Sequence, residues 1–236
     1  MDLFTGTRIN DSQFILAGDE FHHCMRVTRH RTGDSILVTD FDGRIYQSVI
    51  QKPDADQLYL LIEKLFREEH SNAPKISIAI SPTQQMDRFE WFVEKAVENG
   101  IHEIIPLWCK RTENTRLKTE RLQKIITASA KQTLRPLKPE LRDLCRLQDL
   151  FTLKAGVSQR FIGHCEDGLE GFLGSKYNPG EDVLVLIGPA GDFTLEEIEF
   201  ALTHHCIPVS LGAYRLRTET AGLSALQILQ TIRQLL

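Results

Sequence analysis

The stretch VLVLIGPAGDFTLEEIEF (residues 183–200) decides the fold class of this chain. Its apolar run is short enough for a strand buried on both faces, and the acidic amphipathic run behind it predicts a helix. Thr194 opens that helix, and Glu197, three residues later, completes a capping box. A strand, a glycine-containing loop and a helix start are typical of an α/β protein. The loop IGPAGD is therefore a candidate ligand site, either a cradle for a bound group or only a tight turn.

The rest of the chain after residue 74 repeats this alternation of strand and helix. Strand patterns cover residues 75–81, 101–107, 159–165 and 206–212. Helix patterns cover residues 87–100 and 119–134, and a final helix follows Thr220. Strands that alternate with helices predict a parallel sheet with helices on both faces.

The first seventy residues have a different pattern, that of a small β-domain. Short alternating or β-branched segments cover residues 13–18, 35–40, 44–50 and 57–66, and Asp42-Gly43 is the best hairpin turn among them. The polar segment 67–74 ends in proline and has no periodicity, as expected of a linker. We therefore expect a β-barrel or curled sheet over residues 1–70 and an α/β domain over residues 71–236.

Composition indicates an ordinary globular protein rather than a secreted or membrane-spanning one. Hydrophobic residues make up 42% of the 236 residues, and the five cysteines form no C-x-x-C pair. MDLFTGTRIN lacks the basic and apolar runs of a signal peptide, so we expect a cytoplasmic protein with no membrane partner. Histidine adjoins cysteine at 22–24, 164–165 and 204–206. Neighbours on a strand point to opposite faces, so we expect buried thiols and no metal.

Charge is distributed unevenly along the chain. The formal net charge of −4, taken alone, argues against a nucleic-acid partner. Residues 110–146, however, hold eleven basic and four acidic side chains, and residues 22–31 hold three arginines, three histidines and no acid. Phosphate backbones are attracted to such local patches, although a solvated helix face has the same composition.

Three loops of the last third would meet beyond the carboxyl ends of a parallel sheet, at residues 163–168, 188–192 and 212–222. They contain no lysine and neither G-x-x-x-x-G-K-[ST] nor G-x-G-x-x-G, which disfavours a nucleotide-triphosphate or NAD site. The third loop has the most chemistry for its length. Arg215 or Arg217 could stabilise negative charge, with Glu219 orienting a donor or accepting a proton. Equally, Thr220 could be a helix N-cap with Glu219 beside the helix dipole.

Five stretches of the chain resemble one family. LIGPAGDFTLEEIE and LGAYRLRTETAGLSAL resemble two motifs of the SPOUT class of S-adenosylmethionine-dependent RNA methyltransferases. They are most similar to the bacterial family that methylates N3 of a uridine in 16S ribosomal RNA. DEFHHCMRVTRHRTGDSILVTDFDG, MDRFEWFVEKAVENGIHEIIPL and SAKQTLRP resemble further stretches of that family, so that the similarity spans nearly the whole chain.

The resemblance implies a fold and a cofactor site. It implies an RNA-binding, PUA-like β-barrel over residues 1–70, followed by a SPOUT methyltransferase domain over residues 71–236 with a C-terminal trefoil knot. S-adenosylmethionine would lie bent in the knot, held largely by main-chain groups of the three loops, and the knot region would form the interface of a homodimer. The implied cofactor-binding residues are His164, Ile187, Gly188, Pro189, Gly191, Leu211, Gly212, Leu216 and Thr220.

The resemblance also implies a reaction with 16S rRNA or the small ribosomal subunit. Arg217 would stabilise the uridine anion, and Glu219 would act as a base or position Arg217. The RNA contacts would come from His22, Arg26, Arg29, Arg31, Gln132 and Arg135.

The chain departs from the family motif at a few positions of the candidate loops. Ala190 stands where the family usually has glutamate, Asp192 where it often has glycine, and Ala213-Tyr214 where arginine-isoleucine is usual. A SPOUT-fold RNA-binding or assembly factor without activity therefore stays an alternative, as does the same chemistry on another RNA such as tRNA.

Overall fold

The computed structural model describes residues 2–70, 72–164 and 171–235, in two compact units. The first unit comprises residues 1–73 together with 127–138, and the second comprises residues 74–126 together with 139–236. A helix that begins in the second unit therefore has its last residues in the segment 127–138, which belongs to the first unit.

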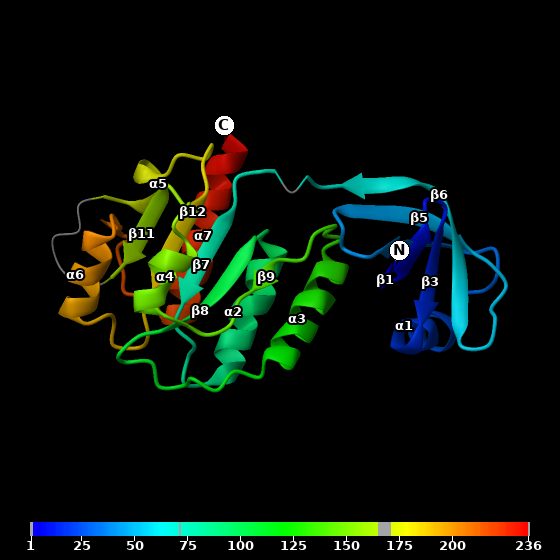
Figure 1. Ribbon diagram of the computed structural model, residues 1–236, viewed down its shortest axis with the longest axis horizontal. Helices are drawn as coiled ribbons and strands as arrows, with labels where there is room; N and C mark the ends of the chain where they lie inside the picture. Colours follow the sequence, from blue (N-terminus) through cyan, green and yellow to red (C-terminus); the bar gives the residue numbers. More distant parts are fainter. Residues whose placement is uncertain (1, 71, 165–170, 236) are drawn as a thin grey trace. The chain divides into compact units, whose positions relative to one another are not determined.

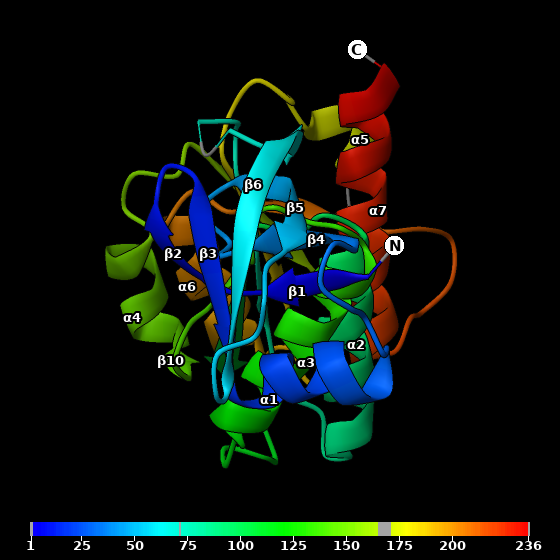
Figure 2. The same cartoon turned by 90° about the vertical axis from the view of Figure 1, so that its right-hand side faces the viewer.

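A curved mixed sheet forms the first unit, with the strand order β1-β4-β5-β6-β3-β2 (Figure 2). The strands are β1 (Leu3–Thr5), β2 (Thr7–Asn10), β3 (Gln13–Ala17), β4 (Ser35–Thr39), β5 (Arg44–Ile50) and β6 (Gln57–Glu68). A short helix α1 (Gly18–His22) and a π-helical turn η1 (His23–Val27) follow β3. Side chains such as Phe4, Phe14 and Leu16 are fully buried and form the core of this sheet. The predicted hairpin at Asp42-Gly43 is confirmed, because β4 and β5 pair antiparallel across it and Gly43 has φ +106°.

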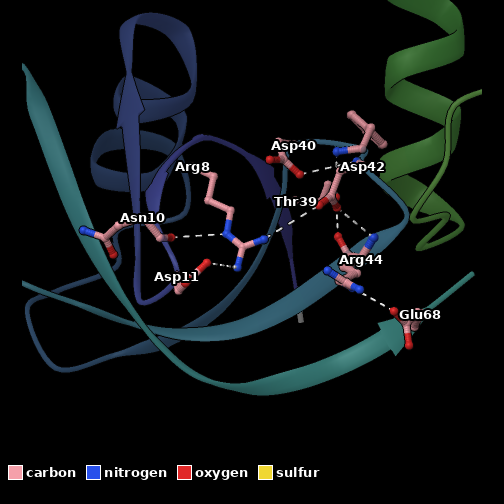
Figure 3. Close-up of polar contacts among 9 residues, drawn as sticks. Arg8, Asn10, Asp11, Thr39, Asp40, Asp42, Arg44 and Glu68 are labelled. Atoms are coloured by element: carbon pink, nitrogen blue, oxygen red, sulfur yellow. Dashed lines mark hydrogen bonds and ion pairs between the residues drawn. The ribbon is translucent and has the colours of Figure 1, made fainter.

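Ion pairs tie the turn of this hairpin to its neighbours (Figure 3). Arg8 on β2 reaches Asp11 at 3.4 Å and Asp42 at 3.8 Å. Arg44, the first residue of β5, donates from Nε to Glu68 Oε1 at 2.7 Å, at the end of β6. Pairs this exposed contribute little to the stability of the unit, because water screens both charges.

A sheet with helices on both faces forms the second unit (Figure 1). The strand order is β10-β8-β7-β12-β11-β13, with β9 on β8, and every pairing that the described residues make in this sheet is parallel. The strands are β7 (Ile76–Ile80), β8 (Glu103–Trp108), β9 (Glu140–Leu141), β10 (Cys145–Arg146), β11 (Gln159–Gly163), β12 (Val183–Ile187) and β13 (Ile207–Val209). The helices are α2 (Met86–Glu98), α3 (Thr119–Gln132), α4 (Leu147–Leu153), α5 (Leu173–Lys176), α6 (Leu195–Thr203) and α7 (Thr218–Leu235).

Both faces of the central strands are buried. All residues of β7 and β12 are buried, as the continuous apolar runs predicted. One face, with Ala79 and Leu186, packs in a cluster with residues of α4 and α6. The other face packs against α7, which also contacts α2. Gly222 permits this approach, because a Cβ there would lie only 2.7 Å from Ile80 Cδ1 and 2.7 Å from Phe92 Cε2.

Several element ends differ from the sequence-based expectation; β6, for example, runs to Glu68, into the predicted linker. Two of the differences lie close to the candidate ligand loops. Helix α7 begins at Thr218, before the predicted start, and β13 covers only part of the predicted strand 206–212. The predicted loop 163–168 extends into residues 165–170, which lie outside the described residues. The trefoil knot depends on the path of that segment and stays a prediction.

Candidate active site

A cavity of about 920 Å³ opens at the carboxyl edge of the parallel sheet, within the second unit. It is lined by residues 82–85 after β7, by Arg111 and Glu113 after β8, by residues 187–193 from the end of β12 onward, and by residues 215–219, which lead into the first turn of α7. Two of the three predicted loops therefore meet, as expected of loops that follow parallel strands.

The loop after β12 is shaped by its own backbone. Gly191 and Asp192 are consecutive residues in the left-handed region, with φ +86° and +69°. Aspartate tolerates this conformation better than most residues, and here Asp192 Oδ1 accepts a hydrogen bond from Phe193 N at 2.8 Å. Helix α6 begins at the end of the loop. The predicted capping box is confirmed, since Thr194 Oγ1 accepts from Glu197 N and Glu197 Oε2 accepts from Thr194 N.

A hydrogen bond joins the start of α7 to the loop after β12. Thr218 Oγ1 donates to Gly188 O at 3.1 Å, which ties the first residue of α7 to the loop after β12. Glu219 is buried, with 8% exposure, and its Oε1 lies 4.0 Å from Arg88 Nε on α2. Arg217 is exposed and lines the cavity. The cavity thus combines main-chain groups of two loops with several guanidinium groups and carboxylates.

The structure brings most of the predicted cofactor and catalytic residues together. The predicted residues that line the cavity are Ile187, Gly188, Pro189, Gly191, Leu216, Arg217 and Glu219. The predicted residues outside the lining are His164, Leu211, Gly212 and Thr220. The first two of these lie close to it, because Gly163, the neighbour of His164, lines the cavity and would carry a Cβ 3.5 Å from Leu211 Cδ1.

Two arginines of the cavity were not among the predicted residues. Arg88 lies in the first turns of α2 and Arg111 in the turn after β8. The only sequence signal for Arg111 was its place in the basic stretch 110–146, and Arg88 had none.

The predicted RNA contacts all lie in the first unit. Those exposed to solvent are His22, Arg26, Arg29, Arg31 and Gln132. Arg135 is different, because it is 8% exposed and its Nη2 lies 3.8 Å from Glu69 Oε1. Burial lowers the pKa of Arg135, while Glu69 opposes that shift. Its contact with RNA stays a prediction that this burial does not favour.

The described cysteines are mostly buried thiols. Cys24, Cys109 and Cys206 are buried, and Cys145 is half-buried. Burial raises the pKa of Cys24 to about 11 and that of Cys206 to about 12, so both stay protonated at neutral pH. Cys165 lies outside the described residues.

Comparison with protein families assigns both parts of the chain. The family model of the RNA methyltransferase domain matches residues 70–230, and that of the RNA methyltransferase PUA domain matches residues 16–63. The chain belongs to the RNA methyltransferase domain family. The fold class expected from the resemblance is confirmed for the parallel sheet with helices on both faces and for the PUA domain that precedes it in the chain. The described strands of the first unit form a curved sheet rather than the expected closed barrel, and the trefoil knot stays a prediction.

Known proteins resemble the chain over nearly its whole length. A curated relative, the ribosomal RNA small subunit methyltransferase E of Bacillus subtilis, is 28% identical over 94% of this chain and 91% of its own. The crystal structure of a probable rRNA-methyltransferase from Porphyromonas gingivalis has a TM-score of 0.90 and 36% identity, covering 100% of this chain and 99% of its own. A methyltransferase from Legionella pneumophila, solved with the bound cofactor SAM, has a TM-score of 0.81 and 26% identity, covering 98% and 96%.

Among the described residues, none of the helices combines the length and the apolar character that crossing a membrane requires.

Proposed function

We propose that this protein transfers the methyl group of S-adenosylmethionine to N3 of a uridine in 16S ribosomal RNA. One observation carries the proposal: the two loops that resemble the family's motifs meet at one cavity, in a domain of the RNA methyltransferase family. The Bacillus subtilis relative is a small-subunit rRNA methyltransferase by name, and the Legionella structure contains the cofactor.

The residues of the cavity fit S-adenosylmethionine. A Cβ at Gly188 would lie 3.0 Å from the Phe193 ring, so glycine at this position allows the ring to pack against the loop in the conformation that lines the cavity. Main-chain groups of residues 187–191 and of Leu216 would hold the cofactor, which supplies an activated methyl group. His164, Leu211, Gly212 and Thr220 remain proposed members of the same site.

The chain's own residues must activate the uridine. N3 carries a proton, which has to leave before or as the N3–methyl bond forms and the sulfur–methyl bond breaks. We assign Arg217 to stabilising the negative charge that remains on the base, because its guanidinium is exposed in the cavity. Glu219 is buried beside Arg88, which favours a role in orienting the cavity's arginines, with proton acceptance as its second role.

The substrate would be bound by the first unit. The exposed basic residues Arg26, Arg29 and Arg31, together with His22 and Gln132, supply donors for phosphate contacts. The resemblance further supports a homodimer, a cytoplasmic location beside the ribosome, and chemistry without a metal. Light scattering on the purified protein tests the dimer.

The decisive experiment is a deletion strain whose 16S rRNA is mapped by mass spectrometry. We expect the loss of one uridine methylation, restored by the wild-type gene. Loss of a methyl group from tRNA instead would redirect the enzyme to that RNA, and an unchanged methylation pattern would overturn the proposal.

Ala190 supports a second candidate, a non-catalytic RNA-binding or assembly factor. It lines the cavity at the position where the family's motif usually has a carboxylate. Titration calorimetry separates the candidates, because a factor that has lost activity together with its cofactor would bind no S-adenosylmethionine even at millimolar concentration.

A further inference from the structure

Arg111 joins the turn after β8 to the loop after β12. Its Nη1 donates to Gly191 O and lies 3.4 Å from Asp192 O and 3.5 Å from Phe193 O. Three successive carbonyls of the 188–193 loop therefore converge on one guanidinium from a segment about eighty residues earlier in the chain.

The turn that carries Arg111 is itself held in place. Thr112 Oγ1 accepts from Cys109 N at 2.8 Å and lies 2.8 Å from Ser81 Oγ, which ties the turn to the end of β7. On the other side, Lys110 N donates to Glu197 Oε1 at 2.7 Å, the same side chain that completes the capping box of α6. Arg111 thus extends from a fixed base toward a loop whose far end is also fixed.

The loop needs such a partner for a physical reason. Its left-handed residues, Gly191 and Asp192, turn successive carbonyls in directions that no regular element can satisfy. All three contacts are made by Arg111 Nη1, whose two N–H groups can donate to two of these carbonyls while its positive charge attracts the third. Lysine would keep the charge but lacks the planar guanidinium that places Nη1 here. Without Arg111, the carbonyls would bond only to water and the loop would sample other conformations.

We infer that Arg111 is a positioning residue, which holds the 188–193 loop in the conformation that binds S-adenosylmethionine. The inference rests on the proposed function for the identity of the ligand. The clasp itself, meaning the bonds from Arg111 to the carbonyls of residues 191–193, is a property of the free protein. Two other roles for Arg111 make different predictions. If Arg111 bound a phosphate of the RNA, its replacement would change the affinity for RNA. If its charge acted directly on the cofactor, its replacement would change the affinities for the positively charged S-adenosylmethionine and for its uncharged product by different factors.

The test compares Arg111→Met and Arg111→Lys with the matched control Arg116→Met. Arg116 lies on the same connection, is exposed, and is bonded through its main-chain amide to Asn114. The first measurement is hydrogen exchange of the amides of residues 190–193 in the cofactor-free protein. We expect about tenfold faster exchange in Arg111→Met, an intermediate rate in Arg111→Lys, and the wild-type rate in Arg116→Met.

The second measurement is calorimetric affinity for S-adenosylmethionine and for S-adenosylhomocysteine, its uncharged product. Arg111→Met should weaken both by about tenfold, the size expected for losing a charge-assisted bond at a partly exposed site. The KM for the cofactor should rise by the same factor, while kcat, the KM for RNA and the midpoint of thermal unfolding stay near wild type.

The outcomes separate the inference from the proposed function. Exchange in Arg111→Met equal to that in Arg116→Met overturns the clasp whatever the ligand. Weakening confined to one of the two ligands, or a rise in the KM for RNA alone, overturns the positioning role. A wild-type protein that binds neither ligand overturns the proposed function and the cofactor part of the inference, while the exchange data still decide on the clasp.

Discussion

Arg217, just before α7, and Glu219, in the first turn of α7, have different surroundings. Arg217 is exposed in the cavity, whereas Glu219 is buried and reaches Arg88 on α2. A group that stabilises developing charge has to face the substrate, and a buried carboxylate beside a guanidinium acts more readily on that guanidinium. At the residue scale, this difference supports the roles proposed for the two residues.

Arg217→Ala should keep cofactor affinity and lower kcat by about a hundredfold or more, the loss usual when one preorganised charge-stabilising donor is removed. Calorimetry with S-adenosylmethionine and methyl transfer to rRNA measure the two quantities. Arg217→Lys, which keeps a positive charge, should recover part of the rate. Unchanged turnover in Arg217→Ala would assign the role to another residue.

Gly222 allows α7 to pack closely against the sheet and against α2. Gly222→Ala places a methyl group 2.7 Å from Ile80 Cδ1 and from Phe92 Cε2, so that side chains or helix must shift. We expect a destabilisation of about 1–3 kcal/mol and a fall of several degrees in the midpoint of thermal unfolding. Gly156→Ala is the matched control, since no atom lies within 4 Å of a Cβ there. Equal midpoints for the two variants would show that α7 accommodates the methyl group freely.

At the element scale, local pattern predicted the central strands and the helix starts that depend on neighbouring residues. Val183–Ile187 is a fully buried strand and α6 has its capping box, because both signals lie within a few residues of the element. The start of α7 was predicted too late, because the sequence does not tell which of the threonines 218 and 220 begins the helix, and the bond from Thr218 to Gly188, thirty residues earlier, has no local signal. The guanidinium groups of Arg88 and Arg111 were missed for the same reason.

Glu103, at the start of β8, shows how a charge can stabilise a sheet. It is 3% exposed, and its carboxylate accepts bonds from Lys154 Nζ, Ser77 Oγ and Arg142 Nε. Burial alone would raise the pKa of Glu103, but the bonds from these three side chains outweigh it and hold the pKa below its ordinary value.

A lowered pKa means that this stabilisation is complete above the ordinary glutamate pKa and is lost as the pH falls through the folded-state value. Glu103→Gln should therefore cost about 2 kcal/mol at neutral pH, because the largely buried Lys154 loses its opposite charge. Arg142 is partly exposed and adds less, since water compensates its charge. The difference from wild type should shrink in acid. Denaturant unfolding from pH 7 down to pH 3 measures this, and a difference that is independent of pH would contradict the assigned network.

At the scale of the whole molecule, the order of β and α/β parts along the chain was readable from the change of periodicity near residue 70. The place of residues 127–138 in the first unit was not, because a continuous helix pattern runs through the first of them. Arg135 belongs to this segment, and its burial follows from a packing that the basic composition of residues 110–146 could not reveal.

If the first unit binds RNA and the second performs the chemistry, as proposed, defects in the two should be separable. Arg26→Gln and Arg31→Gln, combined, remove two exposed positive charges from the first unit. If both arginines bind phosphates, fewer counterions are released when RNA binds, and the slope of log affinity against log salt should fall by roughly one for each arginine replaced. RNA affinity should fall most at low salt, whereas kcat and the affinity for S-adenosylmethionine, which depend on the second unit, should not change.

Lys52→Gln, also exposed in the first unit, is the control for a general effect of charge. An unchanged salt slope in the double variant would place the RNA-binding surface outside residues 22–31, and a fall in cofactor affinity would show that the two functions are not separable.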